Sequence, residues 1–277
     1  MTEEEVIQKE YALEKYYAAK ILEAAPFSDE REKITNEAYA AIAPLVRERG
    51  TLRADSYAYG ARDQYADMIR ALLLYLNRKN PVFYEAGVGT GDIIRSISET
   101  TDAVCRGCDV NVLEELRTIR AEITECSLWR ALAALPDDSI DLFYWNDVME
   151  HIAPDEVERI MALIAAKLKT GGIVFTITPN RKSGPHDITR DADPEKKEAK
   201  GLHLREYTFQ EVNALYRKNG LTPGPALIGV HGNNYVIGRG APAFIKLQSW
   251  LEKHIGRYAP SFSLAQKGRK QTICKPK

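Results

Sequence analysis

The first 78 residues carry apolar side chains at the three- and four-residue spacing that is typical of helices. Pro26 is expected to end the first helix of this region. In the second helix, Pro44 is expected to break or kink the chain and Gly50 to end it. A third helix is expected over residues 61–78, so the region is predicted to be helical throughout.

From residue 81 the pattern changes to short apolar runs that alternate with helical segments. The runs are rich in β-branched and aromatic residues, and they occupy residues 82–87, 103–110, 121–126, 140–147 and 172–180. The clearest helices are residues 154–169 and the segment that begins at Thr208 with a capping box to Glu211. Such alternation predicts an α/β fold with a Rossmann-like, doubly wound, seven-stranded and mainly parallel sheet, preceded by an N-terminal helical extension.

The remaining segments are less regular. Residues 181–203 are polar and contain a charge run, so we expect a long loop that acts as a lid. A sixth strand is expected at 226–231, a helix at Phe244–Leu251 and a last strand at Gln271–Cys274. We therefore divide the chain into a helical cap or lid, residues 1–78, and a ligand-binding domain, residues 79–277.

Composition narrows the range of partners. The chain has 277 residues, a formal net charge of -1 and 44% apolar residues, which is ordinary for a globular protein. The charge balance argues against nucleic acid as a partner. No apolar run is long enough to cross a bilayer, and the acidic N-terminus lacks the features of a secretory signal, so we expect no membrane partner and a cytoplasmic location. A homodimer stays open.

Two of the four cysteines, Cys105 and Cys108, form a CxxC sequence that could indicate redox or metal chemistry. They lie in an expected strand, however, where positions i and i+3 point to opposite faces of a sheet. No second CxxC or histidine pair completes a ligand set. We therefore expect no metal site.

The sequence VFYEAGVGTGD at 82–92 is the strongest chemical signal, because an apolar strand leads directly into Gly87, Gly89 and Gly91 and then into a helix. Such a turn brings a ligand close to the main chain at a helix N-terminus. A dinucleotide would place its diphosphate here, but Asp92 stands where that fingerprint has its third glycine, and Glu85 precedes the turn. Carboxylates instead suit a sulfonium cofactor, which is cationic.

Asp109 ends the second expected strand. A carboxylate at this position can accept hydrogen bonds from both ribose hydroxyls of an adenosine cofactor.

Together these motifs resemble the class I S-adenosylmethionine-dependent methyltransferases. The resemblance rests on EAGVGTGD at 85–92, Asp109, NDVMEHI at 146–152, TPN at 178–180 and HLREYT at 203–208, and it is greatest to bacterial small-molecule methyltransferases with an EH pair after the fourth strand. It implies S-adenosylmethionine as cofactor over about residues 80–240.

The resemblance also implies roles for individual residues. The methionine end and the turn would be lined by Glu85, Gly87, Gly89 and Gly91, and the ribose would be bound by Asp109. Cys126, Ser127 and Leu128 would lie near the adenine, although the acid usual in that stretch is absent and leaves this contact open. Asn146 and Asp147 would lie beside the transferred methyl group.

Methyl transfer to a hydroxyl needs a base, and histidine is suited to that task because its pKa lies near neutrality. The candidates among the five histidines are His151 after the fourth strand, His186 in the long loop and His203, which precedes Leu204-Arg205-Glu206 near the start of the next helix. His231 and His254 are interpreted as structural. Each candidate also has a purely structural interpretation, and which one acts stays open.

The acceptor is the least determined feature. Asn146-Asp147-Val148-Met149 lacks the prolines and the aromatic residue often found at this place in enzymes that methylate nucleobases, so a small-molecule substrate is expected. Tyr16, Tyr17, Tyr57 and Tyr59 could contact a sugar or phenol from the helical cap. We expect O-methylation of a hydroxyl on a sugar or secondary metabolite. The alternatives are N-methylation of a small amine, a nicotinamide-dependent oxidoreductase and a non-catalytic binding protein of the same fold.

Overall fold

The computed structural model describes residues 1–53, 60–229, 235–238, 242–255 and 261–268. Its centre is a seven-stranded sheet with the strand order β3-β2-β1-β4-β5-β9-β6. The strands are β1 (Val82–Ala86), β2 (Val104–Asp109), β3 (Ala121–Glu125), β4 (Ile140–Asn146), β5 (Leu168–Ile177), β6 (Leu221–Pro223) and β9 (Phe262–Lys267). The first five are parallel and β9 is antiparallel to both of its neighbours. The predicted Rossmann-like, mainly parallel sheet is confirmed.

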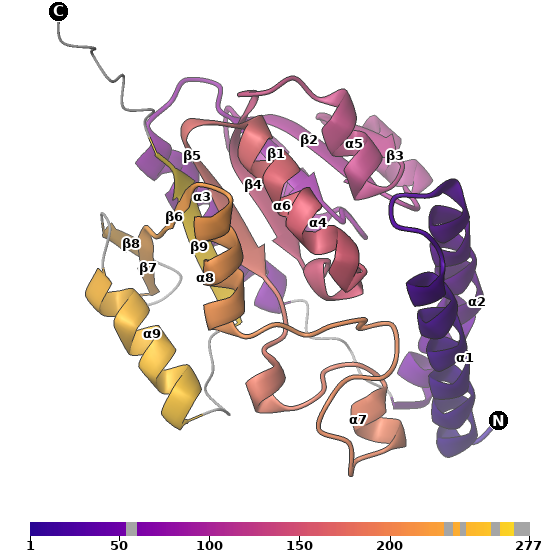
Figure 1. Ribbon diagram of the computed structural model, residues 1–277. Helices are drawn as coiled ribbons and strands as arrows, with labels where there is room; N and C mark the ends of the chain where they lie inside the picture. Colours follow the sequence, from indigo (N-terminus) through magenta and orange to yellow (C-terminus); the bar gives the residue numbers. More distant parts are fainter. Residues whose placement is uncertain (54–59, 230–234, 239–241, 256–260, 269–277) are drawn as a thin grey trace, which may run out of the picture.

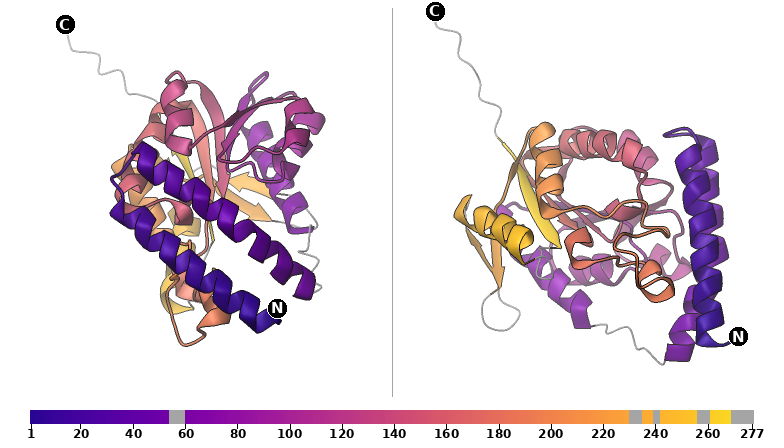
Figure 2. Two further views of the ribbon diagram at one scale, coloured as in Figure 1. Left: turned by 90° about the vertical axis from the view of Figure 1, so that its right-hand side faces the viewer. Right: turned by 60° about the horizontal axis from the view of Figure 1, so that its bottom comes forward.

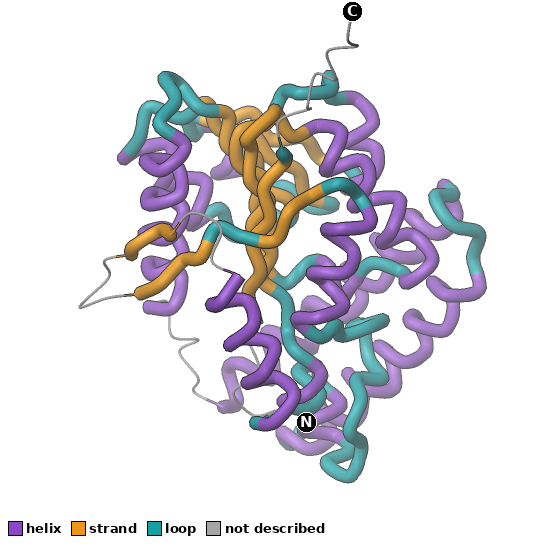
Figure 3. The backbone as a smooth tube through the Cα atoms, turned by 60° about the vertical axis from the view of Figure 1, so that its left-hand side comes forward, coloured by secondary structure: helices purple, strands orange, loops and turns teal. Residues whose placement is uncertain are grey.

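Helices cover both faces of the sheet, as Figures 1 and 3 show. These helices are α3 (Gly60–Leu76), α4 (Asp92–Thr100), α5 (Leu128–Ala134), α6 (Pro154–Lys167), α8 (Phe209–Lys218) and α9 (Pro242–His254). The short turns η1 (Glu114–Thr118), η2 (Met149–His151) and η3 (Arg181–Ser183) connect them. One buried cluster joins α3 and α4 to the sheet, and a second joins α5, α6 and α8 to the other face.

Strand alternation builds these two clusters. Phe83 and Tyr144 pack in the first cluster, whereas Tyr84 and Phe143 pack in the second. The CxxC pair is split in the same way, because Cys105 and Cys108 belong to different clusters. The prediction that the two thiols face opposite sides of the sheet is confirmed.

The capping signals work as expected. Thr208 and Glu211 form the capping box of α8. At the N-terminus of α1 (Glu3–Glu23), Thr2 and Glu5 form a second capping box. Helix α6 begins with Pro154 in its first turn and ends at Lys167, two residues before the predicted end.

Of the break or kink predicted at Pro44, the break is wrong, because α2 runs continuously over Asp29–Arg53. The prediction that Gly50 ends the helix is also wrong. Proline removes one main-chain hydrogen bond and costs a helix interior about 3 kcal/mol. The buried side chains of Ala38 and Ile42, which pack with Ile21 of α1, offset that cost. Helices α1 and α2 lie side by side at one edge of the molecule, as Figure 2 shows.

The predicted boundary at residue 78, between the cap and the ligand-binding domain, differs from the way the helices pack. Helix α3 contributes Ile69, Leu72 and Leu73 to the core beneath the sheet. We therefore use the word cap for α1 and α2 alone, and we count α3 with the sheet.

The loop at 181–203 is not structureless. It contains η3 and the short helix α7 (Thr189–Ala192), and its Ile188 packs against Ile7 and Tyr11 of α1. Its main chain is held by Glu14, whose Oε2 accepts the Leu202 amide at 2.9 Å. The polar composition of the loop did not predict this ordered structure, because the residues that hold the loop belong to the cap.

The C-terminal prediction is partly wrong. Strand β7 (Ala226–Gly229) exists, but it pairs with β8 (Tyr235–Gly238) in a separate two-stranded sheet. The seventh strand of the main sheet is instead Phe262–Lys267. The strand expected at Gln271–Cys274, together with Tyr57, Tyr59 and His231, lies outside the described residues. Among the helices of the described ranges, none is long and apolar enough to cross a membrane.

Candidate functional site

A cavity of about 950 Å³ lies between the carboxyl ends of the central strands and helix α2. The strand ends contribute Glu85, Gly87, Gly89, Asp109, Cys126, Ser127, Leu128, Asn146, Asp147 and His151. The cap contributes Ser28, just before α2, and one face of α2, which includes Arg31, Glu32, Thr35, Asn36, Tyr39, Ala43 and Arg47. The site is thus enclosed by two structural units.

The glycine turn after β1 forms part of the cavity wall. Gly89 has a φ of +53°, and no atom lies within 4 Å of the place that its Cβ would take, because that place opens into the cavity. Gly91 differs, since a Cβ there would lie 2.1 Å from Leu116 Cδ2 and the residue does not line the cavity. It is the N-cap of α4, so its role is to let the chain turn into the helix.

Asp109 is fixed at the end of β2 by the main chain. Its Oδ2 accepts the Gly89 amide at 2.8 Å, and its Oδ1 accepts the Asn111 amide at 3.0 Å. Each carboxylate oxygen can accept a further hydrogen bond. The carboxylate therefore ties the glycine turn to β2 and keeps capacity for ligand hydroxyls.

The stretch after β3 contributes small and weakly polar groups. Ser127 Oγ is buried and has no hydrogen-bond partner. Glu125, the last residue of β3, pairs with Arg117 at 2.9 Å and does not line the cavity. No acid of this stretch reaches the cavity, as the sequence suggested.

The end of β4 carries two acidic residues, of which Asp147 is solvent-exposed and Glu150 is buried. Asp147 lines the cavity with a φ of +53°, and desolvation raises its pKa. Glu150 is fully buried, and burial together with the charge of Asp147 raises its pKa to about 8. Asn146 also lines the cavity, and its Oδ1 has no partner.

Of the three candidate histidines, His151 lines the cavity. Its Nδ1 lies 3.0 Å from the carbonyl oxygen of Leu202. Because a carbonyl can only accept, Nδ1 carries the proton and Nε2 keeps its lone pair. Burial and the neighbouring His203 lower the pKa of His151 to about 3, so its ring is neutral at physiological pH.

His203 and His186 do not line the cavity. Both contact Glu206, with His203 Nδ1 2.9 Å from Oε1 and His186 Nδ1 3.2 Å from Oε2. Burial opposes the charge on Glu206, but its hydrogen bonds to the two histidines outweigh that effect and lower its pKa to about 2. The centroid of the His203 ring lies 4.8 Å from that of His151, so His203 contacts His151 without lining the cavity itself.

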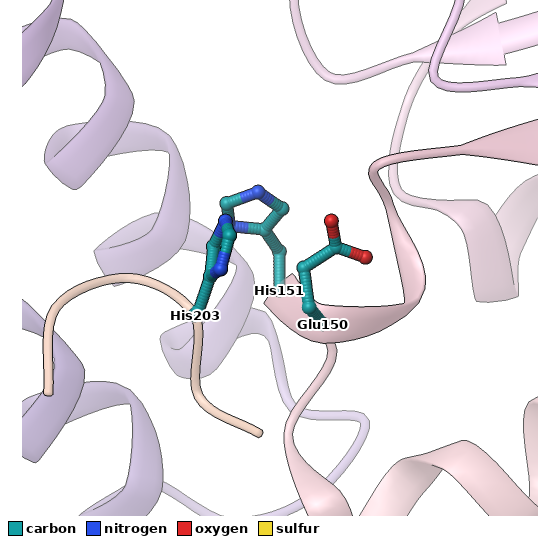
Figure 4. A group of neighbouring side chains, drawn as sticks. All are labelled: Glu150, His151 and His203. Atoms are coloured by element: carbon teal, nitrogen blue, oxygen red, sulfur yellow. The ribbon is translucent and has the colours of Figure 1, made fainter. Parts of the chain in front are cut away.

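Glu150, His151 and His203 are close enough to share a metal ion, with one ligand atom from each lying within 4.8 Å of the others (Figure 4). Both Nδ1 atoms have acceptors of their own, which is also the arrangement seen around metal-bound histidine. The same contacts also suit two histidines that bind no metal, each with its Nδ1 proton directed to an acceptor. The expectation of no metal stays a prediction.

The tyrosines that line the cavity are not those that the sequence indicated. Tyr39 of α2 and Tyr65 of α3 line the cavity, whereas Tyr16 and Tyr17 do not. Tyr39 lies 6.0 Å from the ring of His151, between centroids. The polar residues of α2 recur in the sequence at helical spacing. This is the one signal that could have indicated that α2 lines the cavity.

A mainly parallel sheet with a glycine turn after β1 and a carboxylate at the end of β2 defines a protein that binds a nucleoside cofactor. Residues 84–176, from β1 to β5, match the family model described as the methyltransferase domain. These residues therefore form a methyltransferase domain, and the chain has the fold of S-adenosylmethionine-dependent methyltransferases. The comparison with curated proteins found no match.

Solved structures with this fold include enzymes of different acceptor classes. A 1,6-didemethyltoxoflavin-N1-methyltransferase of Burkholderia thailandensis is 17% identical, with a TM-score of 0.51 over 89% of this chain and 93% of that one. An O-methyltransferase family protein of Burkholderia thailandensis is 12% identical, with a TM-score of 0.52 over 96% and 72%. The CurJ carbon methyltransferase is 11% identical, with a TM-score of 0.51 over 96% and 70%. At these identities the similarity is one of fold.

Proposed function

We propose that the protein transfers a methyl group from S-adenosylmethionine to a hydroxyl of a small molecule, such as a sugar or secondary metabolite, bound between the strand ends and α2. The observation that carries the proposal is His151, which lines the cavity with Nδ1 held by Leu202 and the Nε2 lone pair available. A hydroxyl must lose its proton when it becomes an ether. A neutral imidazole at the cavity wall can accept that proton.

The wall offers suitable partners for the cofactor. Ser127 Oγ and Asn146 Oδ1 are buried and have no partner in the protein, and both residues line the cavity. Glu85 and the glycine turn would hold the amino-acid end, and Asp109 the ribose. When bound, S-adenosylmethionine supplies a methyl group on positively charged sulfur, and the carboxylates of the wall favour that charge.

The volume also supports a site for two molecules. Small-molecule pockets span roughly 300–1,000 Å³, and this cavity, at about 950 Å³, lies near the upper end. Tyr39 and Tyr65 lie on the cap and α3 side and would contact the acceptor. Tyrosine combines an apolar ring with a hydrogen-bonding hydroxyl, which suits sugars and phenols.

N-methylation of a small amine is the second candidate, and the low pKa of His151 favours it. An imidazole with a pKa of about 3 is a weak base. A neutral amine needs no proton removed before it accepts the methyl group, so the same cavity could serve without base catalysis.

The test combines product analysis with one variant. Purified protein is incubated with S-adenosylmethionine and panels of hydroxyl and amine compounds, and methylated products are identified by mass spectrometry. For an O-methyltransferase, His151→Asn should lower kcat by ~10²–10⁴-fold while the Kd for S-adenosylhomocysteine stays unchanged. An amine product, or an O-methylated product with kcat unchanged in the variant, would contradict His151-assisted O-methylation.

A further inference from the structure

We infer that Glu32, on the cap helix α2, supplies the carboxylate that accepts a hydrogen bond from the adenine amino group of the cofactor. It would thereby replace the acid that residues 126–128 lack. The inference rests on S-adenosylmethionine binding in the cavity described above. It assigns part of the cofactor site to the cap.

The order of the strands indicates where the adenine lies. Along the sheet edge the strand ends follow one another as β3, β2, β1 and β4. With the ribose at Asp109 of β2 and the amino-acid end at Glu85 of β1, the base must extend toward β3. It therefore lies beside Cys126, Ser127 and Leu128, which line that end of the cavity.

This end of the cavity lacks an anionic acceptor from the sheet. The adenine amino group is a donor, and a thiol is a poor acceptor for it. Ser127 offers a hydroxyl, which is neutral and forms weaker hydrogen bonds than a carboxylate does. Glu125 is directed to Arg117 instead, with about half of its side chain exposed.

Glu32 reaches this place from the opposite wall. Its Oε1 lies 3.3 Å from the Ser127 amide nitrogen, which is long for such a hydrogen bond, so Oε1 keeps capacity to accept another. Its Oε2 accepts from Arg130 Nε at 2.6 Å. Although burial opposes its charge, the hydrogen bonds from Arg130 and Ser127 lower the pKa of Glu32, so the carboxylate is ionised.

The neighbouring contacts hold Glu32 in position. Arg31, the preceding residue, forms two hydrogen bonds to Asp155 of α6, at 2.7 and 3.1 Å. The main-chain amide of Phe27 donates to Glu156 at 2.6 Å. These contacts dock the start of α2 on the sheet domain, so the adenine site is complete when the cap is docked.

The experiment compares two ligands on four proteins by isothermal titration calorimetry. The ligands are S-adenosylhomocysteine and S-inosylhomocysteine, which has a carbonyl in place of the amino group. The proteins are the wild type, Glu32→Ala, Asp29→Asn and Ser127→Ala. Asp29 is the matched control because it also pairs with Arg130 from α2, but its side chain is 93% exposed and does not line the cavity.

We expect the wild type and Asp29→Asn to bind the adenosyl ligand at least about tenfold more tightly than the inosyl ligand, as for a hydrogen bond to a charged group. Glu32→Ala should lose this preference, mainly by weaker binding of the adenosyl ligand. If Glu32→Ala weakens both ligands equally, Glu32 acts only on cap docking and the inference fails. It also fails if the preference disappears in Ser127→Ala and persists in Glu32→Ala.

If the proposed function itself is wrong, the same experiment gives a different result. If the wild type binds neither ligand, the assignment of the cofactor itself is wrong. If the wild type binds the adenosyl ligand and Glu32→Ala behaves like the wild type toward both, only the role of Glu32 is overturned.

Discussion

The cavity has two walls that are built in different ways. The wall at the strand ends comes from residues at or shortly after the carboxyl ends of strands, such as Gly89, Asp109 and His151. The wall on α2 comes from one face of a helix, with Glu32 and Tyr39 among its members. The first wall is held by main-chain geometry within the sheet domain, whereas the second is held by side-chain contacts between separate units. Cofactor binding should therefore tolerate changes in the first wall less than in the second.

The largest effect is expected at Gly89. A leucine there would have to adopt a φ of +53°, and its side chain would enter the cavity. We expect Gly89→Leu to abolish measurable binding of S-adenosylhomocysteine in calorimetry. Gly220→Leu is the control, because Gly220 also has a positive φ and open space but lies outside the cavity. If Gly89→Leu binds the ligand as tightly as the wild type does, the glycine turn is not part of the cofactor site.

Next in size is the docking of the cap through Arg31. This buried guanidinium forms ion pairs with Asp155 and Glu156 at 2.7 and 3.0 Å. Its loss leaves Glu156 buried without that partner, which costs about 3 kcal/mol. We expect Arg31→Ala to lower Tm and to release the cap to proteolysis. Lys33→Ala is the control, because the exposed pair of Lys33 with Glu37 should contribute little. Equal Tm values in both variants would show that this contact does not hold the cap.

A smaller loss is expected at Asp109. Asp109→Ala removes a charged acceptor for the ribose hydroxyls, which is worth ~1.5–3 kcal/mol. The Kd for S-adenosylhomocysteine should therefore rise about 10- to 150-fold, measured by calorimetry. Unchanged affinity would exclude the ribose role and leave Asp109 as a support for the Gly89 amide.

The smallest effect concerns pH and the cap. Burial raises the pKa of Glu14 from 4.5 to about 7, although its hydrogen bond with the Leu202 amide opposes this. A group whose pKa is raised in the folded state stabilises it below the unfolded pKa, and this contribution is lost as the pH rises from about 4.5 to 7. We expect the free energy of unfolding of the wild type to fall over this range by more than that of Glu14→Gln, with a difference on the order of 1–2 kcal/mol, and Tm measured against pH reports this difference. Parallel Tm profiles of the two proteins would contradict the shift.

The sheet could be predicted from local pattern because a strand that is buried on both faces is mainly apolar, and the runs at 82–87 and 140–147 are mainly apolar. The turn at Gly87 and Gly89 and the carboxylate of Asp109 follow directly from those strands. The predictions failed where contacts with residues distant in the sequence determine the structure. Helix α2 continues through Pro44 because α1 packs against it. The strand Ala226–Gly229 pairs with β8 and not with the main sheet.

The sequence alone determined the fold class and the cofactor class, and it predicted which residues lie at the strand ends. These depend on short-range rules, since a strand, the turn after it and the next helix are contiguous in the chain. Only the tertiary structure decided that α2 closes the cavity, that His151 rather than His186 or His203 lines it, and that Glu32 lies at the Ser127 amide. Those facts depend on contacts between residues that are far apart in the sequence, and no local spacing encodes such contacts.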